Sequence, residues 1–169
     1  KDILLINPTE SYKENWGIIS RFADKVPPLN LIYLLSYIQS KGFQADVIDC
    51  NMEVNPINAI LKKLKEEGYS FVGFTTTTPL VQKIYELSKI IKENYPKIIQ
   101  LAGGAHPSFM PENMLHNSKI DYVIRGEGEI TLFEILQKKN IFEIDGLSYR
   151  QSSNIIHNKD RKLIEDLNT

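Results

Sequence analysis

The sequence predicts a doubly wound α/β fold, in which a parallel sheet is covered by helices on both faces. Two observations predict it: five short apolar runs recur along the chain, and the stretches between them carry apolar residues with helical period. Parallel neighbours need a crossover helix, so this alternation is typical of a parallel sheet. Buried strands are expected at residues 3–7, 45–49, 71–75, 98–103 and 122–125.

Each intervening stretch carries the signals of a helix. The first places four leucine and isoleucine side chains on one face between residues 31 and 38, and ends at Gly42, a common C-terminal cap. The second begins at Asn55 as N-cap with Pro56 at the first helical position, and ends before Gly68. Further helices are expected after Thr78-Pro79, after Pro111 and over residues 129–138, and a small C-terminal hairpin over residues 146–150 and 155–157.

Length and composition describe one globular domain. The 169 residues carry 20 basic and 21 acidic side chains, a near-neutral balance that removes the electrostatic case for a nucleic-acid binder. No apolar run approaches a membrane span and no secretory signal is seen, so we expect a cytoplasmic protein without a membrane span. Cys50 is the single cysteine, which excludes an internal disulfide and a cysteine-held metal cluster. Because the chain starts at Lys1 and ends at Thr169 without a helix stop, we expect it to be a segment of a longer protein.

Doubly wound sheets bind ligands beyond the carboxyl ends of their strands, so the loops after the strands are the candidate site. The loop after the first strand, residues 7–29, is longer than a typical strand-to-helix loop. It is either a surface insertion or a lid for a large ligand, with Trp16 and Phe22 as apolar surface.

The three later loops carry small or polar residues. Residues 75–78 are four threonines, which either donate and accept hydrogen bonds to a ligand or serve as strand formers and a helix cap. Gly103-Gly104 permits close backbone approach, although turns also use such pairs freely. Residues 125–129, Arg-Gly-Glu-Gly-Glu, lack the Walker and dinucleotide spacings and also fit a capped turn into a helix.

Four motifs together resemble a known family. They are VPPLNLIYL at residues 26–34, GFTTTTP at 73–79, GGAHP at 103–107 and YVIRGEGE at 122–129. In this order they are similar to the N-terminal cobalamin-binding domain of cobalamin-dependent radical SAM enzymes, a group that includes anaerobic magnesium-protoporphyrin monomethyl ester cyclases and many methyltransferases. The resemblance implies a flavodoxin-like, Rossmann-like five-stranded sheet that binds the corrin over its carboxyl edge.

The resemblance also implies an organisation and a site. Residues 1–140 would form the cobalamin-binding domain, and residues 141–169 a hairpin and linker towards a C-terminal radical SAM domain of the same polypeptide, absent from this chain. S-adenosylmethionine and a [4Fe-4S] cluster are expected only in that domain, because its cluster needs three cysteines. This chain is therefore expected to bind cofactor without performing chemistry alone, in a parent enzyme of methyl transfer or oxidative cyclisation. The cofactor-binding residues implied are Asn7, Pro8, Pro28, Thr75, Thr76, Thr77, Gly103, Gly104, His106, Arg125, Gly126, Glu127 and Gly128.

One departure from better-known cobalamin domains concerns the metal. Mutases and methionine synthase carry Asp-x-His-x-x-Gly after the first strand, whose histidine ligates cobalt, whereas no histidine precedes His106 here. The lower face of cobalt is then without a protein imidazole, or is met by water or by His106. The missing histidine keeps a second hypothesis open: a degenerate flavodoxin-like domain that acts as scaffold or recognition module without cofactor. A flavin or nucleotide module is a third, which the acidic 126–129 turn argues against.

Overall fold

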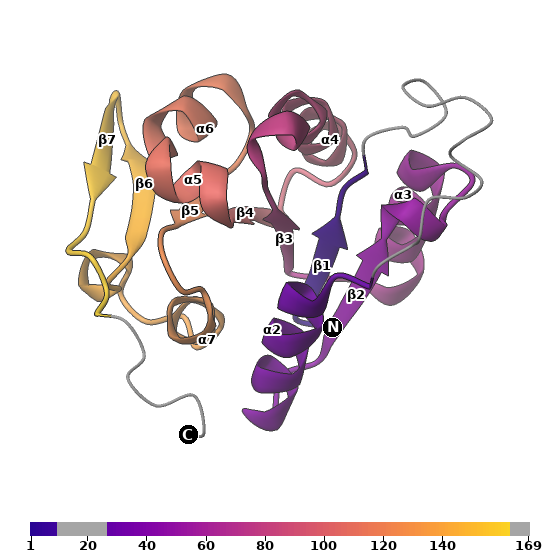
Figure 1. The fold of residues 1–169 in the computed structure, drawn as a ribbon, viewed down its shortest axis with the longest axis horizontal. Helices are drawn as coiled ribbons and strands as arrows, with labels where there is room; N and C mark the ends of the chain where they lie inside the picture. Colours follow the sequence, from indigo (N-terminus) through magenta and orange to yellow (C-terminus); the bar gives the residue numbers. More distant parts are fainter. Residues whose placement is uncertain (10–26, 163–169) are drawn as a thin grey trace.

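A single seven-stranded sheet forms the centre of the computed structural model, which describes residues 1–9 and 27–162 (Figure 1). The first five strands in sequence pair in parallel, and the last two continue the same sheet as an antiparallel hairpin. From edge to edge the strands are β2 (Ala45–Asp49), β1 (Ile3–Asn7), β3 (Phe71–Thr75), β4 (Ile99–Gly103), β5 (Tyr122–Ile124), β6 (Leu147–Gln151) and β7 (Asn154–His157).

Local sequence signals begin and end the crossover helices. In the helix that follows β2, the side chain of Asn55 accepts a hydrogen bond from the Asn58 amide at 3.2 Å, Pro56 holds the first helical position, and Gly68 ends the helix at φ +67°. The helices are α2 (Leu29–Ser40), α3 (Pro56–Glu67), α4 (Val81–Asn94), α5 (Ala105–Phe109), α6 (Pro111–Asn117) and α7 (Glu129–Leu136), with 3₁₀ turns at Cys50–Met52, Thr78–Leu80 and Ile141–Glu143.

The two faces of the sheet are covered unequally. Helices α3, α4 and α6 pack on one face in a large apolar cluster, whereas α2 and α7 pack on the other (Figure 1). Alternation along each strand divides the side chains between the faces: Leu4 and Ile6 join the first cluster, and Ile3 and Leu5 join the second. The central part of the second face therefore lies between two helices.

The structure confirms the predicted α/β class with five parallel strands. The predicted hairpin is also present, and because β6 pairs with β5 it raises the sheet to seven strands. The helix expected after Thr78-Pro79 begins with a 3₁₀ turn and becomes α-helical at Val81. Helix α5 was not expected; it begins directly after Gly104.

Some sequence predictions concern residues outside the two described ranges. The candidate lid residues Trp16 and Phe22 and the last residues, 163–169, lie outside the described residues. Within the described ranges, no helix is long and apolar enough to cross a bilayer.

Cys50 gives a test of the packing at the end of β2. Its side chain is 1% exposed, and burial raises the pKa of its thiol from 9.0 to about 12. We expect no reaction of the folded protein with a chromogenic disulfide reagent at pH 8, and one reactive thiol per chain in denaturant. Because the pKa is raised on folding, the thiol's contribution to stability is full below pH 9 and is lost as the pH rises towards 12. Rapid labelling of the folded protein would contradict this packing.

Candidate functional site

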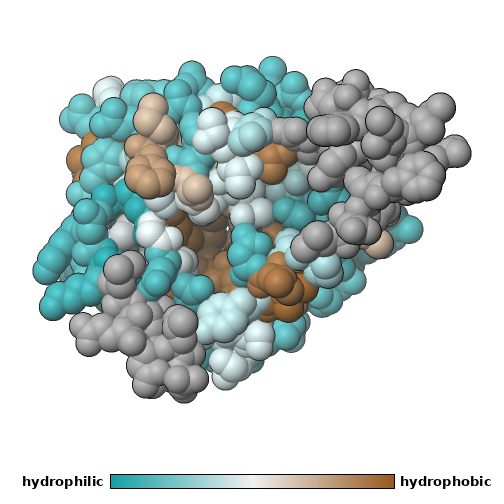
Figure 2. Space-filling view, viewed as in Figure 1, coloured by the Kyte–Doolittle hydropathy of each residue, from teal (hydrophilic) through white to brown (hydrophobic). Residues whose placement is uncertain are grey.

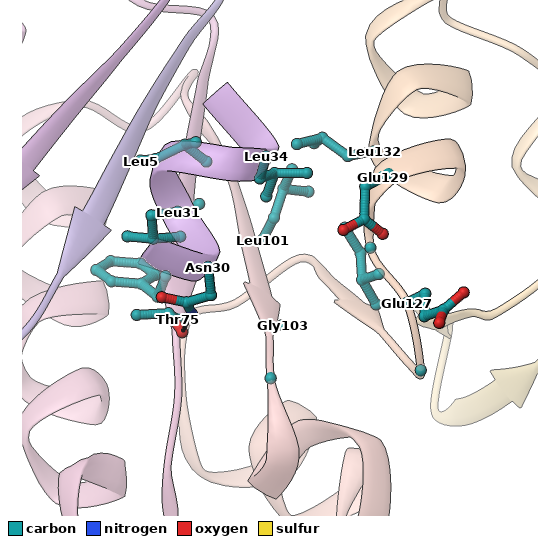
Figure 3. Close-up of a pocket in the computed structure, with 16 residues that line it drawn as sticks. Leu5, Asn30, Leu31, Leu34, Thr75, Leu101, Gly103, Glu127, Glu129 and Leu132 are labelled. Atoms are coloured by element: carbon teal, nitrogen blue, oxygen red, sulfur yellow. Dashed lines mark hydrogen bonds between the residues drawn. The ribbon is translucent and has the colours of Figure 1, made fainter. Parts of the chain in front are cut away.

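A cavity of about 220 Å³ opens on the face that α2 and α7 cover, at the carboxyl ends of the parallel strands. Figure 2 shows the same place as a hollow with apolar side chains at its floor. Figure 3 shows α2 on one side and α7 on the other, with Leu34 facing Leu132 and with Leu101 of β4 near both. The cavity is thus an apolar cleft that lies between two helices.

Gly73 of β3 lines the floor of this cleft. A Cβ atom built on Gly73 would lie 3.0 Å from Cδ2 of Leu5 and 3.5 Å from Cδ1 of Ile3. Leu101 is its register partner on β4 and also lines the cavity. A side chain at position 73 would press against Leu5, so the glycine leaves room for the side chain of Leu5 beside the cleft.

The mouth of the cavity is formed by two glycine-containing turns that are bonded together. Gly104 has φ +108°, and a Cβ there would be 2.8 Å from the Thr76 carbonyl oxygen. The hydroxyl of Ser108 donates to the carbonyl of Gly104 at 2.8 Å and accepts from the Gly126 amide at 3.0 Å. Ser108 therefore fixes the turn after β4 against the turn after β5.

The β3 threonines occupy three different environments. Thr75 lines the cavity, and its hydroxyl accepts a hydrogen bond from Nδ2 of Asn30 at 2.9 Å, which joins α2 to β3. Thr76 is fully buried, and its Oγ1 has no hydrogen-bond partner among the described residues. Thr77 is exposed beyond the strand.

The end of β1 is held by a carboxylate of β2. Oδ1 of Asp49 accepts from Nδ2 of Asn7 at 2.9 Å and from the backbone amide and Nδ2 of Asn51 at 3.0 and 2.8 Å. Oδ1 of Asn51 in turn accepts from the Thr9 hydroxyl at 2.5 Å. Asn7 is therefore engaged within the protein, and this network fixes the start of the loop after β1.

The structure brings six of the predicted site residues to the cavity, and the other seven lie around it. Pro8 is buried after β1, and Pro28 precedes α2. The six that line the cavity are Thr75, Gly103, Gly104, Gly126, Glu127 and Gly128, and the seven that do not are Asn7, Pro8, Pro28, Thr76, Thr77, His106 and Arg125.

Arg125 and His106 direct their side chains to protein partners. The Arg125 guanidinium donates to Asp160 at 2.5 Å and to the carbonyl of Asn158, so it binds the segment after β7. In His106, Nδ1 lies 3.3 Å from Oγ1 of Thr78, and Nε2 is buried without a partner among the described residues. Neither side chain lines the cavity.

Sequence reasoning missed the walls of the cavity. Leu31, Leu34 and Leu101 were expected in helix or strand cores, and their apolar periodicity is the same whether they contact protein or a ligand. Glu129 was read as a capping carboxylate at the start of α7, but it lines the cavity. The one available signal was Gly73, a glycine inside a buried strand.

The described residues contain no group of three or more His, Cys, Asp or Glu side chains that could hold a metal ion. The cavity is instead suited to an organic ligand, with apolar walls and bare glycine backbone at its mouth.

Comparison with known proteins decides the family. Residues 15–136 match the family model described as B12 binding domain. The chain belongs to the B12-binding domain family. This finding confirms the resemblance that the four sequence motifs predicted, and with it cobalamin as the cofactor class.

The relatives of this B12-binding domain are larger proteins. It is 31% identical to an uncharacterized methyltransferase from Pyrococcus horikoshii, and the match covers 99% of this chain and 36% of that protein. It is 26% identical to an anaerobic magnesium-protoporphyrin IX monomethyl ester cyclase from Synechocystis, and the match covers 98% of this chain and 34% of that protein. The chain thus spans about a third of the length of these curated relatives.

A solved structure shares the fold. The B12-binding domain matches 30% of the radical S-adenosylmethionine methyltransferase TsrM from Kitasatospora setae, a structure with cobalamin and a [4Fe-4S] cluster bound. The match covers 99% of this chain with a TM-score of 0.79 at 19% sequence identity. At this identity the likeness shows that the two folds correspond.

The glycine pair at the mouth gives a test of its geometry. Gly104→Val forces a branched side chain into a left-handed conformation against Thr76, so we expect a loss of about 1–3 kcal/mol in the free energy of unfolding. Gly103→Ala is the matched control, because a Cβ there has 3.9 Å to its nearest neighbour and the conformation is not left-handed. Urea unfolding followed by circular dichroism measures both, and equal losses would contradict the assignment.

Proposed function

We propose that this domain holds a cobalamin with its corrin over the carboxyl edge of the sheet and its nucleotide tail in the cavity between α2 and α7. The observation that carries the proposal is the cavity itself, an apolar cleft open at the edge where parallel sheets bind ligands. Its volume of about 220 Å³ is below that of pockets for whole drug-sized ligands, so it suits one end of a large cofactor. The tail of cobalamin ends in a flat, apolar base, which is the kind of group that apolar walls can bury.

The mouth of the cavity fits the polar part of a cobalamin, which offers many amides and one phosphate. Nothing lies within 4 Å of a Cβ built on Gly126, and the nearest atoms at Gly103 and Gly128 are at 3.9 and 3.8 Å. A ligand can therefore approach the backbone of these turns closely. Beside them, Oγ1 of Thr76, which has no partner among the described residues, is a hydrogen-bonding group that a small local rearrangement would make available.

When bound, the cofactor supplies a cobalt centre that can carry a methyl group. The residues of this chain bind and orient it. The leucines of α2, β4 and α7 exclude water from the tail, and the Ser108 bridge holds both glycine turns in position. The Asn30–Thr75 hydrogen bond fixes the start of α2 beside them.

For the parent protein we propose methyl transfer or oxidative cyclisation together with a radical SAM domain of the same polypeptide. The names of the relatives, methyltransferases and a cyclase, support these reaction classes, and their greater length supports a further domain. That domain would contribute S-adenosylmethionine and the cluster. The division of the chain near residue 140 belongs to this proposal, and the cytoplasmic location stays a prediction.

Cofactor retention tests the cavity. Gly103→Leu adds a side chain at the mouth without backbone strain, so we expect corrin affinity to fall about ten-fold or more. Purified protein is mixed with hydroxocobalamin, freed of excess, and its bound corrin is measured by visible absorption. Lys62→Leu, an exposed site on α3, is the control and should keep the affinity of the parent chain.

The same experiment distinguishes cobalamin binding from the rival hypothesis of a scaffold domain without cofactor. A scaffold without cofactor, the hypothesis that the missing histidine of the first loop keeps open, retains no corrin in any variant. Corrin bound equally by Gly103→Leu and the parent chain would move the site away from the cavity.

The axial position of cobalt gives a second test. Because Nε2 of His106 is buried and Nδ1 is engaged with Thr78, we expect His106 not to ligate cobalt. Electron paramagnetic resonance of the Co(II) form should give the same spectrum for the parent chain and His106→Ala. Nitrogen superhyperfine splitting that disappears in the variant would contradict this expectation.

A further inference from the structure

Glu129 is a carboxylate inside the apolar cavity. It is the first residue of α7, and Figure 3 shows its carboxyl group directed into the space between α7 and α2. Oε2 is buried, and within the described part of the chain it has no hydrogen-bond partner.

The electrostatic surroundings of Glu129 include the N-terminus of α7 and a tyrosine of α2. A carboxylate in the first turn of a helix interacts favourably with the helix dipole. Tyr37 of α2 has a pKa raised by its burial and then by the negative charge of Glu129. Arg161, which also acts on Tyr37, is itself bonded to Glu134 and Thr131. Among these neighbours, none donates a hydrogen bond to Glu129.

A buried acceptor of this kind costs free energy until a donor meets it. Among the described residues none supplies this donor, so a ligand that enters the cavity can supply it. In the proposed function, this is the base at the end of the cofactor's tail, since the corrin is too large for a volume of about 220 Å³.

The natural bases of such cofactors differ in the hydrogen bonds that they can offer. Dimethylbenzimidazole, the base of cobalamin, carries methyl groups and a ring nitrogen with a lone pair, and has no N–H group in its neutral form. An adenine base carries an exocyclic amino group with two N–H donors. A carboxylate accepts from the amino group of adenine, whereas neutral dimethylbenzimidazole offers it no donor.

We propose that Glu129 selects cofactors whose lower base carries an N–H donor, an adenine-type base, over cobalamin with its dimethylbenzimidazole. This inference rests on the proposed function, because it requires the tail to occupy the cavity. The leucine walls supply affinity for any flat base, and Glu129 supplies the discrimination.

The test compares three corrinoids on the purified protein by equilibrium titration of their visible spectra. They are the adenine-containing cobamide, cobalamin, and cobinamide, which lacks the nucleotide tail. We expect the adenine cobamide to bind about ten-fold tighter than cobalamin, as a hydrogen bond to a charged group provides, and cobinamide to bind most weakly.

Variants assign the preference to the carboxylate. Glu129→Leu should bring the adenine cobamide and cobalamin to within about two-fold of one another. Glu129→Gln keeps the size and one acceptor oxygen but loses the charge, so it should retain a reduced preference and guards against a folding defect in the leucine variant. Glu93→Leu, an exposed carboxylate on α4 of the opposite face, is the matched control and should keep the full preference.

The outcomes separate this inference from the proposed function. Equal affinity of the parent chain for the two complete cobamides, or a preference that survives in Glu129→Leu, overturns the role of Glu129 and leaves cobalamin binding intact. Cobinamide bound as tightly as the complete cobamides shows that the tail lies elsewhere and overturns the inference. If none of the three corrinoids binds, the proposed function fails, and the inference fails with it.

Discussion

The site depends on how few helices cover one face of the sheet. Among the described elements, helices α3, α4 and α6 pack on the first face, whereas α2 and α7 pack on the second, with β3 and β4 between them (Figure 1). A strip of sheet between two helices has to be filled by large side chains or left open. At Gly73, β3 offers no side chain of its own, and Leu5 occupies the space beside it, while the cavity lies between Leu34 of α2, Leu101 of β4 and Leu132 of α7. The apolar cavity is therefore a consequence of the separation of the two helices.

The turns that carry the polar atoms of the site meet at the carboxyl edge of the sheet. Parallel strands bring their carboxyl ends together, so the turns after β4 and β5 become neighbours although they are distant in sequence. Ser108 bonds the two turns, and Asn30 bonds the start of α2 to Thr75. These hydrogen bonds hold the turns against one another without a ligand, which lowers the ordering cost of binding.

The sequence was sufficient for the scaffold and for the turns, and insufficient for the walls. Strands and helices follow from short-range periodicity, and the caps at Asn55 and Gly68 lie where local residue preferences put them. The glycine turns were identified because their chemistry is local. Leu31 and Leu34 were assigned to a helix face correctly, but apolar periodicity is the same whether that face contacts protein or lines a cavity. Arg125 shows the opposite limit: its partners Asn158 and Asp160 lie more than 30 residues away, and only the folded chain shows that they engage it.

Features that cost stability converge at this edge, and their convergence is stronger evidence of function than any one alone. Unpartnered buried atoms also occur elsewhere, at Gln100 and Tyr149 in the packed core, so such an atom does not define a site. At the carboxyl edge, however, Thr76 and Glu129 carry atoms without a partner in the described part of the chain, beside a left-handed Gly104 and an open cavity. A fold selected for stability alone would fill the cavity and pair the carboxylate, because both changes reduce the free energy of the folded state. The persistence of both at one place is what a chain requires when part of its core is supplied by a cofactor.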